Sequence, residues 1–170
     1  MINMKVLLIT GESGAGKTTF AKHLKENYNY NIVHSYTTRS KRDEQDNDHI
    51  FISKDRAYEM MNNEEIVAHT QINKEHYFTT VFDFKLDRPN AYIVDAKGVK
   101  DVKKNCPEWD ITVLKVITNK NHVSEDRLKR DIAIPEDHEC DLILERKVIH
   151  KYNLTKKNVH VPKPNWVDVL

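Results

Sequence analysis

Three of the four glycines in this chain of 170 residues fall within six positions near the N-terminus. They belong to the run Gly11-Glu12-Ser13-Gly14-Ala15-Gly16-Lys17-Thr18, which Thr19 follows. This run satisfies G-x-x-x-x-G-K-[ST], the pattern of a phosphate-binding loop, which lies between a strand and a helix. An apolar run at residues 6–9 precedes it, and residues 19–26 have the pattern of an amphipathic helix. The sequence therefore predicts that residues 11–19 bind a nucleoside triphosphate.

The residue types in this loop suit phosphate binding. Glycine permits backbone angles closed to other residues and leaves no side chain to obstruct the phosphates. The amide N–H groups of the loop and of the helix N-terminus then face the anion, aided by the helix dipole. Lys17 would reach the β- and γ-phosphates, and the hydroxyl of Thr18 would hold Mg²⁺. We therefore expect ATP as the donor, with Mg²⁺ as cofactor.

The elements that must position this loop are apolar runs that alternate with helical patterns. Strands are expected at residues 6–9, 31–35, 91–95 and 111–117, with a short fifth at 140–144, and helices at 19–26, 56–61 and 99–104. Strands separated by helices indicate an α/β fold with a central parallel sheet and helices on both faces. In such folds ligands bind at the carboxyl ends of the strands, where the loop lies.

The pattern changes between the second and third expected strands. Residues 36–85 hold several short β-like stretches, one expected helix and a cluster of basic residues. We interpret this stretch as an insertion that binds the substrate. The chain is expected to be a single domain over 1–170, with a core at 1–35 and 88–150 and the inserted lobe at about 36–86. The tail at 152–170 is expected to follow the surface and receives no role.

Composition limits the classes of partner. With 27 basic and 26 acidic residues, the net charge of +1 offers no general argument for binding nucleic acid or membranes. Cys106 and Cys140 lack C-x-x-C spacing, so neither a disulfide framework nor a metal site is indicated. The N-terminal apolar run is too short for a signal peptide or a membrane span. We expect a soluble cytoplasmic protein, and the sequence leaves its oligomeric state undetermined.

A second informative stretch is Ser35-Tyr36-Thr37-Thr38-Arg39-Ser40-Lys41-Arg42, followed by Asp48-His49-Ile50-Phe51. Together with the loop it resembles guanylate kinase and its relatives among the nucleoside monophosphate kinases, which are P-loop kinases. In that family the loop is followed, across one helix and one strand, by S-x-T-T-R-x-x-R and then D-Y-x-F. The resemblance implies that Arg39 and Arg42 clamp the phosphate of an acceptor monophosphate. A planar guanidinium suits that task because its fork matches phosphate oxygens.

Further matches cover about residues 4–145. Residues 63–68 resemble the stretch that carries a guanine-reading glutamate, 76–79 resemble Y-Y-G-[TS], 95–98 resemble D-x-Q-G, and 127–130 resemble the start of a lid. The resemblance implies a three-layer P-loop NTPase fold with an inserted NMP-binding lobe and a shortened lid at about 123–140. It implies acceptor contacts from Ser35, Arg39, Arg42, His49, Tyr77, Thr79 and Asp95. It also implies that Arg127 and Arg130 act with Lys17 and Arg39 on the transferred phosphoryl group.

The chain departs from the family where the base would be read. Ala68 stands in the position of the guanine-reading glutamate, His49 in that of the D-Y-x-F tyrosine, and Phe78 in that of the glycine. The loop between the second arginine and the aspartate is two residues shorter. Phosphate-handling residues thus match while base-reading residues do not. This pattern favours a kinase with altered or broadened acceptor choice.

Two questions about individual residues remain open at this point. His69, Gln71 and Asn73 alternate as on a strand, so one of them could replace the missing base reader. Exposed positions on a strand face explain them equally well. Asp95 follows a buried strand, and a capping role would explain it as well as a contact with the acceptor. No histidine pattern typical of a zinc site is present.

Three functions are compatible with these features. The expected one is ATP-dependent phosphorylation of a nucleoside monophosphate, of GMP or dGMP type or with broadened specificity. A P-loop kinase of a small non-nucleotide acceptor would keep Lys17 and the arginines without a base pocket. A non-catalytic interaction module on a guanylate kinase-like fold is the third, and the intact phosphate loop argues against it.

Overall fold

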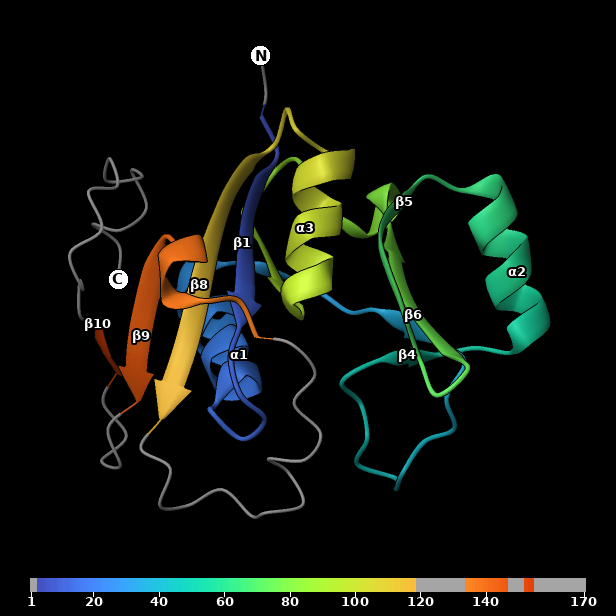
Figure 1. The fold of residues 1–170 in the computed structure, drawn as a ribbon, viewed down its shortest axis with the longest axis horizontal. Coiled ribbons are helices and arrows are strands. Elements are labelled where there is room, and N and C mark those ends of the chain that lie inside the picture. The colour runs from blue at the N-terminus through green and yellow to red at the C-terminus, as the bar shows by residue number, and fades with distance from the viewer. Residues whose placement is uncertain (1–2, 119–133, 147–151, 155–170) are drawn as a thin grey trace.

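The computed structural model describes residues 3–118, 134–146 and 152–154. Most of the predicted lid at about 123–140, including Arg127 and Arg130, lies outside the described residues, as does most of the tail. No helix in the described part of the chain is long and apolar enough to cross a membrane. Figure 1 shows two bodies of regular structure: a sheet with helices against it, and a smaller lobe of strands and one helix beside it.

The larger body is built on a six-stranded sheet in the order β10-β9-β8-β1-β7-β2. Its strands are β1 (Lys5–Thr10), β2 (Asn31–Val33), β7 (Asn90–Ile93), β8 (Asp110–Thr118), β9 (Leu142–Arg146) and β10 (Tyr152–Leu154). The first five of these strands run parallel to one another, whereas β10 runs antiparallel to β9. The five parallel strands correspond to the five expected from the sequence. The edge strand β10 was not anticipated.

Helices cover both faces of this sheet, as the alternation of strands and helices predicted. Side chains of β1 point alternately to its two faces. Leu7 packs in one buried cluster with Phe20 of α1 (Lys17–Tyr28), and Leu8 packs in another with Val102 of α3 (Ala96–Asn105). All four side chains are at most 2% exposed. The central layer therefore has an apolar core on each side, and the fold is the three-layer α/β arrangement of P-loop NTPases.

The smaller lobe holds a four-stranded sheet in the order β4-β3-β6-β5, with α2 packed against it. Its elements are β3 (Tyr36–Thr37), β4 (Ile50–Phe51), α2 (Lys54–Asn63), β5 (Ile66–Ile72), β6 (Glu75–Thr80) and a 3-10 helix, η1 (Val81–Asp83). All of them fall inside the stretch interpreted as an insertion. Ser53 caps α2 by accepting a hydrogen bond from the N–H of Arg56 at 3.2 Å. Ala57 and Met60 then pack against Phe78 of β6.

The lobe is joined to the core along α3. Asp101 of α3 accepts a hydrogen bond from the backbone N–H of His69 at 3.2 Å, and Asn105 donates to the carbonyl of Val67 at 3.0 Å. Val67 also lies in the same buried cluster as Val102. These contacts bring the β5–β6 hairpin beside the carboxyl end of the core sheet. The cavity described below opens between them.

Candidate active site

The phosphate loop connects β1 to α1 in a conformation that depends on glycine. Gly11, Gly14 and Gly16 all have positive φ, at 137°, 78° and 101°. At Gly11 a Cβ atom would lie 2.1 Å from the carbonyl oxygen of Val116 on the neighbouring strand, so no larger residue fits. Gly16 precedes α1 without a side-chain cap, and the first turn carries no acidic residue. Neither a capping side chain nor an acidic residue thus competes with an anion at the N-terminus of α1.

Lys17 and Thr18 are the first two residues of α1, in the position that the sequence predicts for contacts with phosphate and Mg²⁺. The Lys17 ammonium donates to the carbonyl oxygens of Gly11 and Glu12 at 2.6 and 2.8 Å, so its charge lies against the loop. Thr18 is half-buried on the first turn. Its hydroxyl is the hard oxygen ligand that Mg²⁺ accepts, and Mg²⁺ commonly takes its other ligands from water and substrate phosphates. The Thr18 hydroxyl is therefore compatible with Mg²⁺, and its contact with the metal stays a prediction.

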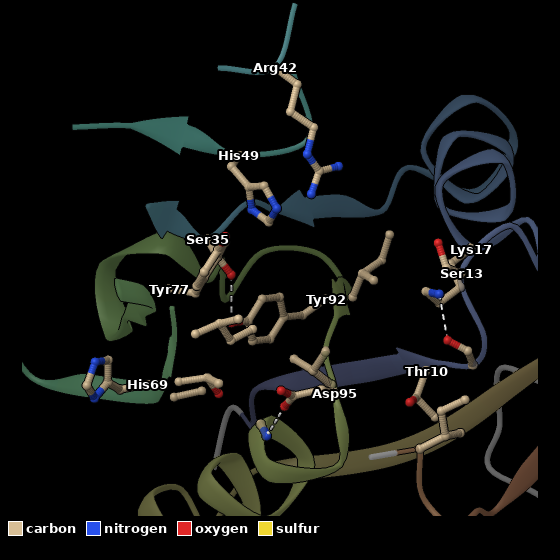
Figure 2. Close-up of a pocket in the computed structure, with 18 residues that line it drawn as sticks. Thr10, Ser13, Lys17, Ser35, Arg42, His49, His69, Tyr77, Tyr92 and Asp95 are labelled. Carbon is tan, nitrogen blue, oxygen red and sulfur yellow. Dashed lines mark hydrogen bonds between the residues drawn. The ribbon is translucent and has the colours of Figure 1, made fainter. Parts of the chain in front are cut away.

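A cavity of about 340 Å³ joins the loop to the lobe. The residues predicted from the sequence that line this cavity are Gly11, Ser13, Lys17, Ser35, Arg42, His49, Tyr77 and Asp95. Figure 2 shows Lys17 and Ser13 entering from one side, with Arg42, His49 and Ser35 across from them. Residues far apart in the sequence therefore face one shared space.

Arg39 lies differently from Arg42, although the resemblance implied one shared clamp. Arg42 lines the cavity and Arg39 does not. The guanidinium of Arg39 donates to the Asp46 carboxylate at 2.7 and 3.4 Å and lies over the Phe51 ring, 5.1 Å from its centroid. Asp46 also accepts the backbone N–H of Arg42 at 3.0 Å. These bonds, the one from Arg39 above all, lower the pKa of Asp46 to about 2.

The structure thus pairs Arg39 with a carboxylate that the sequence analysis did not assign to it. The side chains of Arg39 and Asp46 are only 15% and 9% exposed. Their ion pair ties the segment after β3 to the segment before β4. In this arrangement Arg39 organises the loop that carries Arg42 and His49. Its direct contact with an acceptor stays a prediction.

The register of the β5–β6 hairpin decides which side chains face the cavity. Ala68 is opposite Thr79, and Thr70 is opposite Tyr77. Ala68, Thr70 and Tyr77 line the cavity, whereas Thr79 is fully buried and is not part of the wall. Thr70 is a cavity residue that the sequence analysis missed.

The opposite face of this hairpin carries the residues that were considered as substitute base readers. The imidazole of His69 stacks on that of His76, with centroids 5.2 Å apart and Nε2 2.9 Å from Nδ1. His69 contributes to the cavity wall, yet Figure 2 shows its ring directed away. Gln71 is opposite His76 and exposed, and Asn73 has a φ of 51° in the turn. The exposed positions of Gln71 and Asn73 agree with the second explanation offered for them, whereas His69 lies at the cavity wall and its contact with a base stays a prediction.

The capping role of Asp95 is present in the structure, and its contact with the acceptor stays a prediction. Its Oδ1 accepts the N–H of Gly98 at 2.7 Å and so caps α3. Asp95 also lines the cavity, at the carboxyl end of β7. The close approach of helix and strand here requires a small residue, since a Cβ on Gly98 would lie 3.0 Å from that of Val94.

Tyr92 is a further cavity residue that the sequence analysis missed. Its phenol is buried on β7 and shares a hydrogen bond of 2.9 Å with the hydroxyl of Ser35. Burial raises the pKa of Tyr92, and the bond to Ser35 offsets this in part. A tyrosine within a buried strand needs a partner for its hydroxyl. The need for such a partner, close to Asp95 at the end of the strand, was the signal that could have identified Tyr92 as a cavity residue.

Fold and cavity together define a P-loop NTPase whose phosphate loop faces an inserted lobe. The family model described as guanylate kinase matches residues 3–131. The chain belongs to the guanylate kinase family.

Individual relatives are distant. The chain is 30% identical over 111 residues to a guanylate kinase of Prochlorococcus marinus, covering 61% of this chain and 60% of that protein. It is 27% identical over 134 residues to a guanylate kinase of Campylobacter jejuni, covering 74% of this chain and 65% of that protein. The chain thus spans less than two thirds of the length of these curated relatives.

The fold is also similar to the crystal structure of guanylate kinase from Anaplasma phagocytophilum, with a TM-score of 0.54. That match has 18% identity and covers 76% of this chain and 66% of the other. At this level of identity the likeness concerns the fold alone.

Proposed function

We propose that this chain is a nucleoside monophosphate kinase that transfers the γ-phosphoryl group of ATP to GMP or dGMP, with broadened acceptance of other bases. The observation that carries this proposal is the single cavity between the phosphate loop and the inserted lobe. Phosphoryl transfer needs donor and acceptor held in line between positive groups, with little covalent chemistry from the protein. Lys17 on one wall and Arg42 on the other meet that need.

The donor side follows from the loop. Its amides and the Lys17 ammonium would hold the β- and γ-phosphates and stabilise the charge that develops on them. Thr18 would hold Mg²⁺, which would supply positive charge to neutralise the phosphates. Arg127 and Arg130 are proposed to close over the triphosphate, as the family resemblance implies. Excluding water in this way would favour transfer over hydrolysis.

The acceptor side is proposed to hold a monophosphate through Arg42, Tyr77 and His49. Arg39 would hold these residues in place through its ion pair with Asp46. If the acceptor displaces the Asp46 carboxylate, Arg39 would contact the phosphate as well. Ser35 would meet the base, with Tyr92 as its buried partner. Asp95 would lie near the ribose while it caps α3.

Base choice is proposed to be weaker than that of an enzyme with a buried carboxylate. Ala68 faces the cavity where the family resemblance would have a glutamate. The neighbouring cavity residues Ser35, Thr70 and Tyr92 offer hydroxyls, which both donate and accept hydrogen bonds. A hydroxyl adapts to several base edges, whereas an unpaired carboxylate rejects a wrong base strongly.

The decisive experiment is a coupled assay of ADP release with ATP and Mg²⁺ across ribo- and deoxyribonucleoside monophosphates. We expect turnover of GMP or dGMP and of at least one other monophosphate. Strict GMP specificity would contradict the broadened choice and leave the kinase assignment intact. ATP binding with no turnover of any monophosphate would instead favour a non-nucleotide acceptor. Absence of ATP binding would overturn the proposal as a whole.

A further inference from the structure

His49 has a buried ring nitrogen without a partner at the wall of the cavity. Its Nδ1 is inaccessible to solvent and makes no hydrogen bond within the described part of the chain. The ring packs edge-on against Tyr77, with centroids 5.4 Å apart, and against Phe51 at 6.4 Å. A buried polar atom left unbonded costs free energy, and His49 lines the cavity, so its imidazole is a candidate ligand contact.

The charged groups around this ring come from two segments. Arg39 and Arg42 precede it in the loop, and Asp46 and Asp48 follow them. Tyr77 of β6 is the titratable side chain that packs on the ring from the hairpin. Because Arg39 is paired with Asp46, the positive charge on the His49 side of the cavity comes chiefly from Arg42. Figure 2 shows the Arg42 guanidinium and the His49 imidazole directed into the same part of the cavity.

These surroundings favour the neutral form of the ring in the absence of an anion. Burial lowers the pKa of His49, and the charge of Arg39 lowers it further, while Asp48 and Asp46 act in the opposite sense. An acceptor phosphate carries a charge between −1.5 and −2 near pH 7. Bound between Arg42 and the ring, it would favour the charged imidazolium, which has donors at both nitrogens.

We propose that His49 takes up a proton from solvent when the acceptor binds, and that the imidazolium then donates a ring N–H to the acceptor phosphate. This inference rests on the proposed function, since it assigns His49 a role toward the monophosphate. Arg42 and His49 then both contact the acceptor phosphate, and the contact from His49 is present only when its ring is protonated. Acceptor affinity becomes dependent on pH through one side chain, whereas ATP affinity does not.

Proton uptake can be measured directly by titration calorimetry of GMP, without ATP, in two buffers of different ionisation enthalpy. At pH 7 we expect uptake of at least about half a proton for each GMP bound to the wild-type protein. The phosphate of GMP, whose own pKa is about 6, would release protons on binding as a dianion and so gives the opposite sign. No net uptake, or net release, would overturn the inference.

Two variants and a matched control assign the proton to His49. His49→Tyr keeps an aromatic donor that does not titrate near pH 7, and His49→Gln removes the titrating ring. His34→Gln makes the same change at an exposed histidine that lies outside the cavity wall and hydrogen-bonds to the carbonyl of Asp48. We expect proton uptake to vanish in both His49 variants and to persist in the control. Uptake that persists in His49→Tyr or His49→Gln would contradict the assignment.

The pH profile gives a second measurement. The ratio of the acceptor KM of His49→Gln to that of the wild type should rise at least about fivefold from pH 8 to pH 6, because the histidine contact strengthens on protonation. The KM for ATP should show no such change. A constant ratio would overturn the inference.

Should both His49 variants fail to bind GMP, NMR titration of the His49 ring in the wild type decides the matter. An unchanged ring pKa with GMP bound would overturn the inference. Failure of GMP and all other monophosphates to bind would instead count against the proposed function.

Discussion

The phosphate loop and the acceptor lobe handle phosphate by different physical means. The loop uses consecutive residues, and its conformation rests on positive-φ glycines and one backbone contact with Val116. The lobe collects side chains from the segment between β3 and β4 and from β6, and the Arg39–Asp46 ion pair orders that segment. A backbone site tolerates little change at any position. A side-chain site can exchange individual residues, and this chain differs from its family there, at His49 and Ala68.

The largest effect should come from the loop. Lys17→Ala is expected to lower the rate of phosphoryl transfer by about 10²–10³, because the ammonium meets charge that develops in the transition state. Lys22→Ala, an exposed lysine on the same helix, is the matched control and should leave the rate unchanged. Steady-state kinetics with circular dichroism checks both. Near-normal turnover by a folded Lys17→Ala protein would contradict the phosphate-loop mechanism.

The two arginines of the lobe should differ from each other in their coupling to Asp46. Arg42→Lys should raise the acceptor KM roughly tenfold, because a point charge replaces a bidentate fork, and ATP affinity should hardly change. Arg39→Lys should also weaken acceptor binding. If it acts through the ion pair, its effect and that of Asp46→Asn will not add in a double-mutant cycle.

Arg56→Lys on the outside of α2 serves as the control for this pair. Additive effects of Arg39→Lys and Asp46→Asn would show that Arg39 meets the acceptor independently of Asp46. Equal losses of ATP and acceptor binding in Arg42→Lys would contradict the division of the cavity into two sides.

The hairpin should allow base choice to be changed alone. Ala68→Glu would add a carboxylate to the cavity wall, and we expect the preference for GMP over other monophosphates to rise about tenfold. Gln71→Glu adds the same charge to the opposite face of β5 and should leave the preference unchanged. The monophosphate panel measures both variants. A shift of equal size in the two would mean that net charge, rather than base contact, governs the choice.

The smallest effect concerns stability and pH. Because its folded-state pKa is lowered to about 2, Asp46 stabilises the fold fully above its ordinary value of 3.8. That contribution is lost as the pH falls from about 4 to about 2. Asp46→Asn should therefore cost about 1 kcal/mol near neutral pH and progressively less as the pH falls from about 4 through about 2. Denaturant unfolding of both proteins across this range checks the convergence, and a constant difference in the free energy of unfolding would refute it.

Much of the fold followed from local patterns. The five parallel strands and the helices α1, α2 and α3 were expected because apolar runs and helical periodicity are properties of neighbouring residues. The edge strand β10 was missed because three residues with an antiparallel partner leave no such pattern. The side of the hairpin that faces the cavity was also unpredictable, since the register shifts between Ile66 and Ala68. A shift of one residue exchanges the two faces of a strand.

The sequence by itself determined the phosphate loop, the family and the absence of a glutamate at position 68. These depend on residue types at fixed spacings within short segments. Only the tertiary structure decided that Arg39 is paired with Asp46, that Tyr92 is the partner of Ser35, and that Thr70 lines the cavity while the ring of His69 stacks on His76. Each of these outcomes depends on where separate segments meet in space. Burial and partner geometry, which set the charge and direction of a side chain, exist only once those segments are packed together.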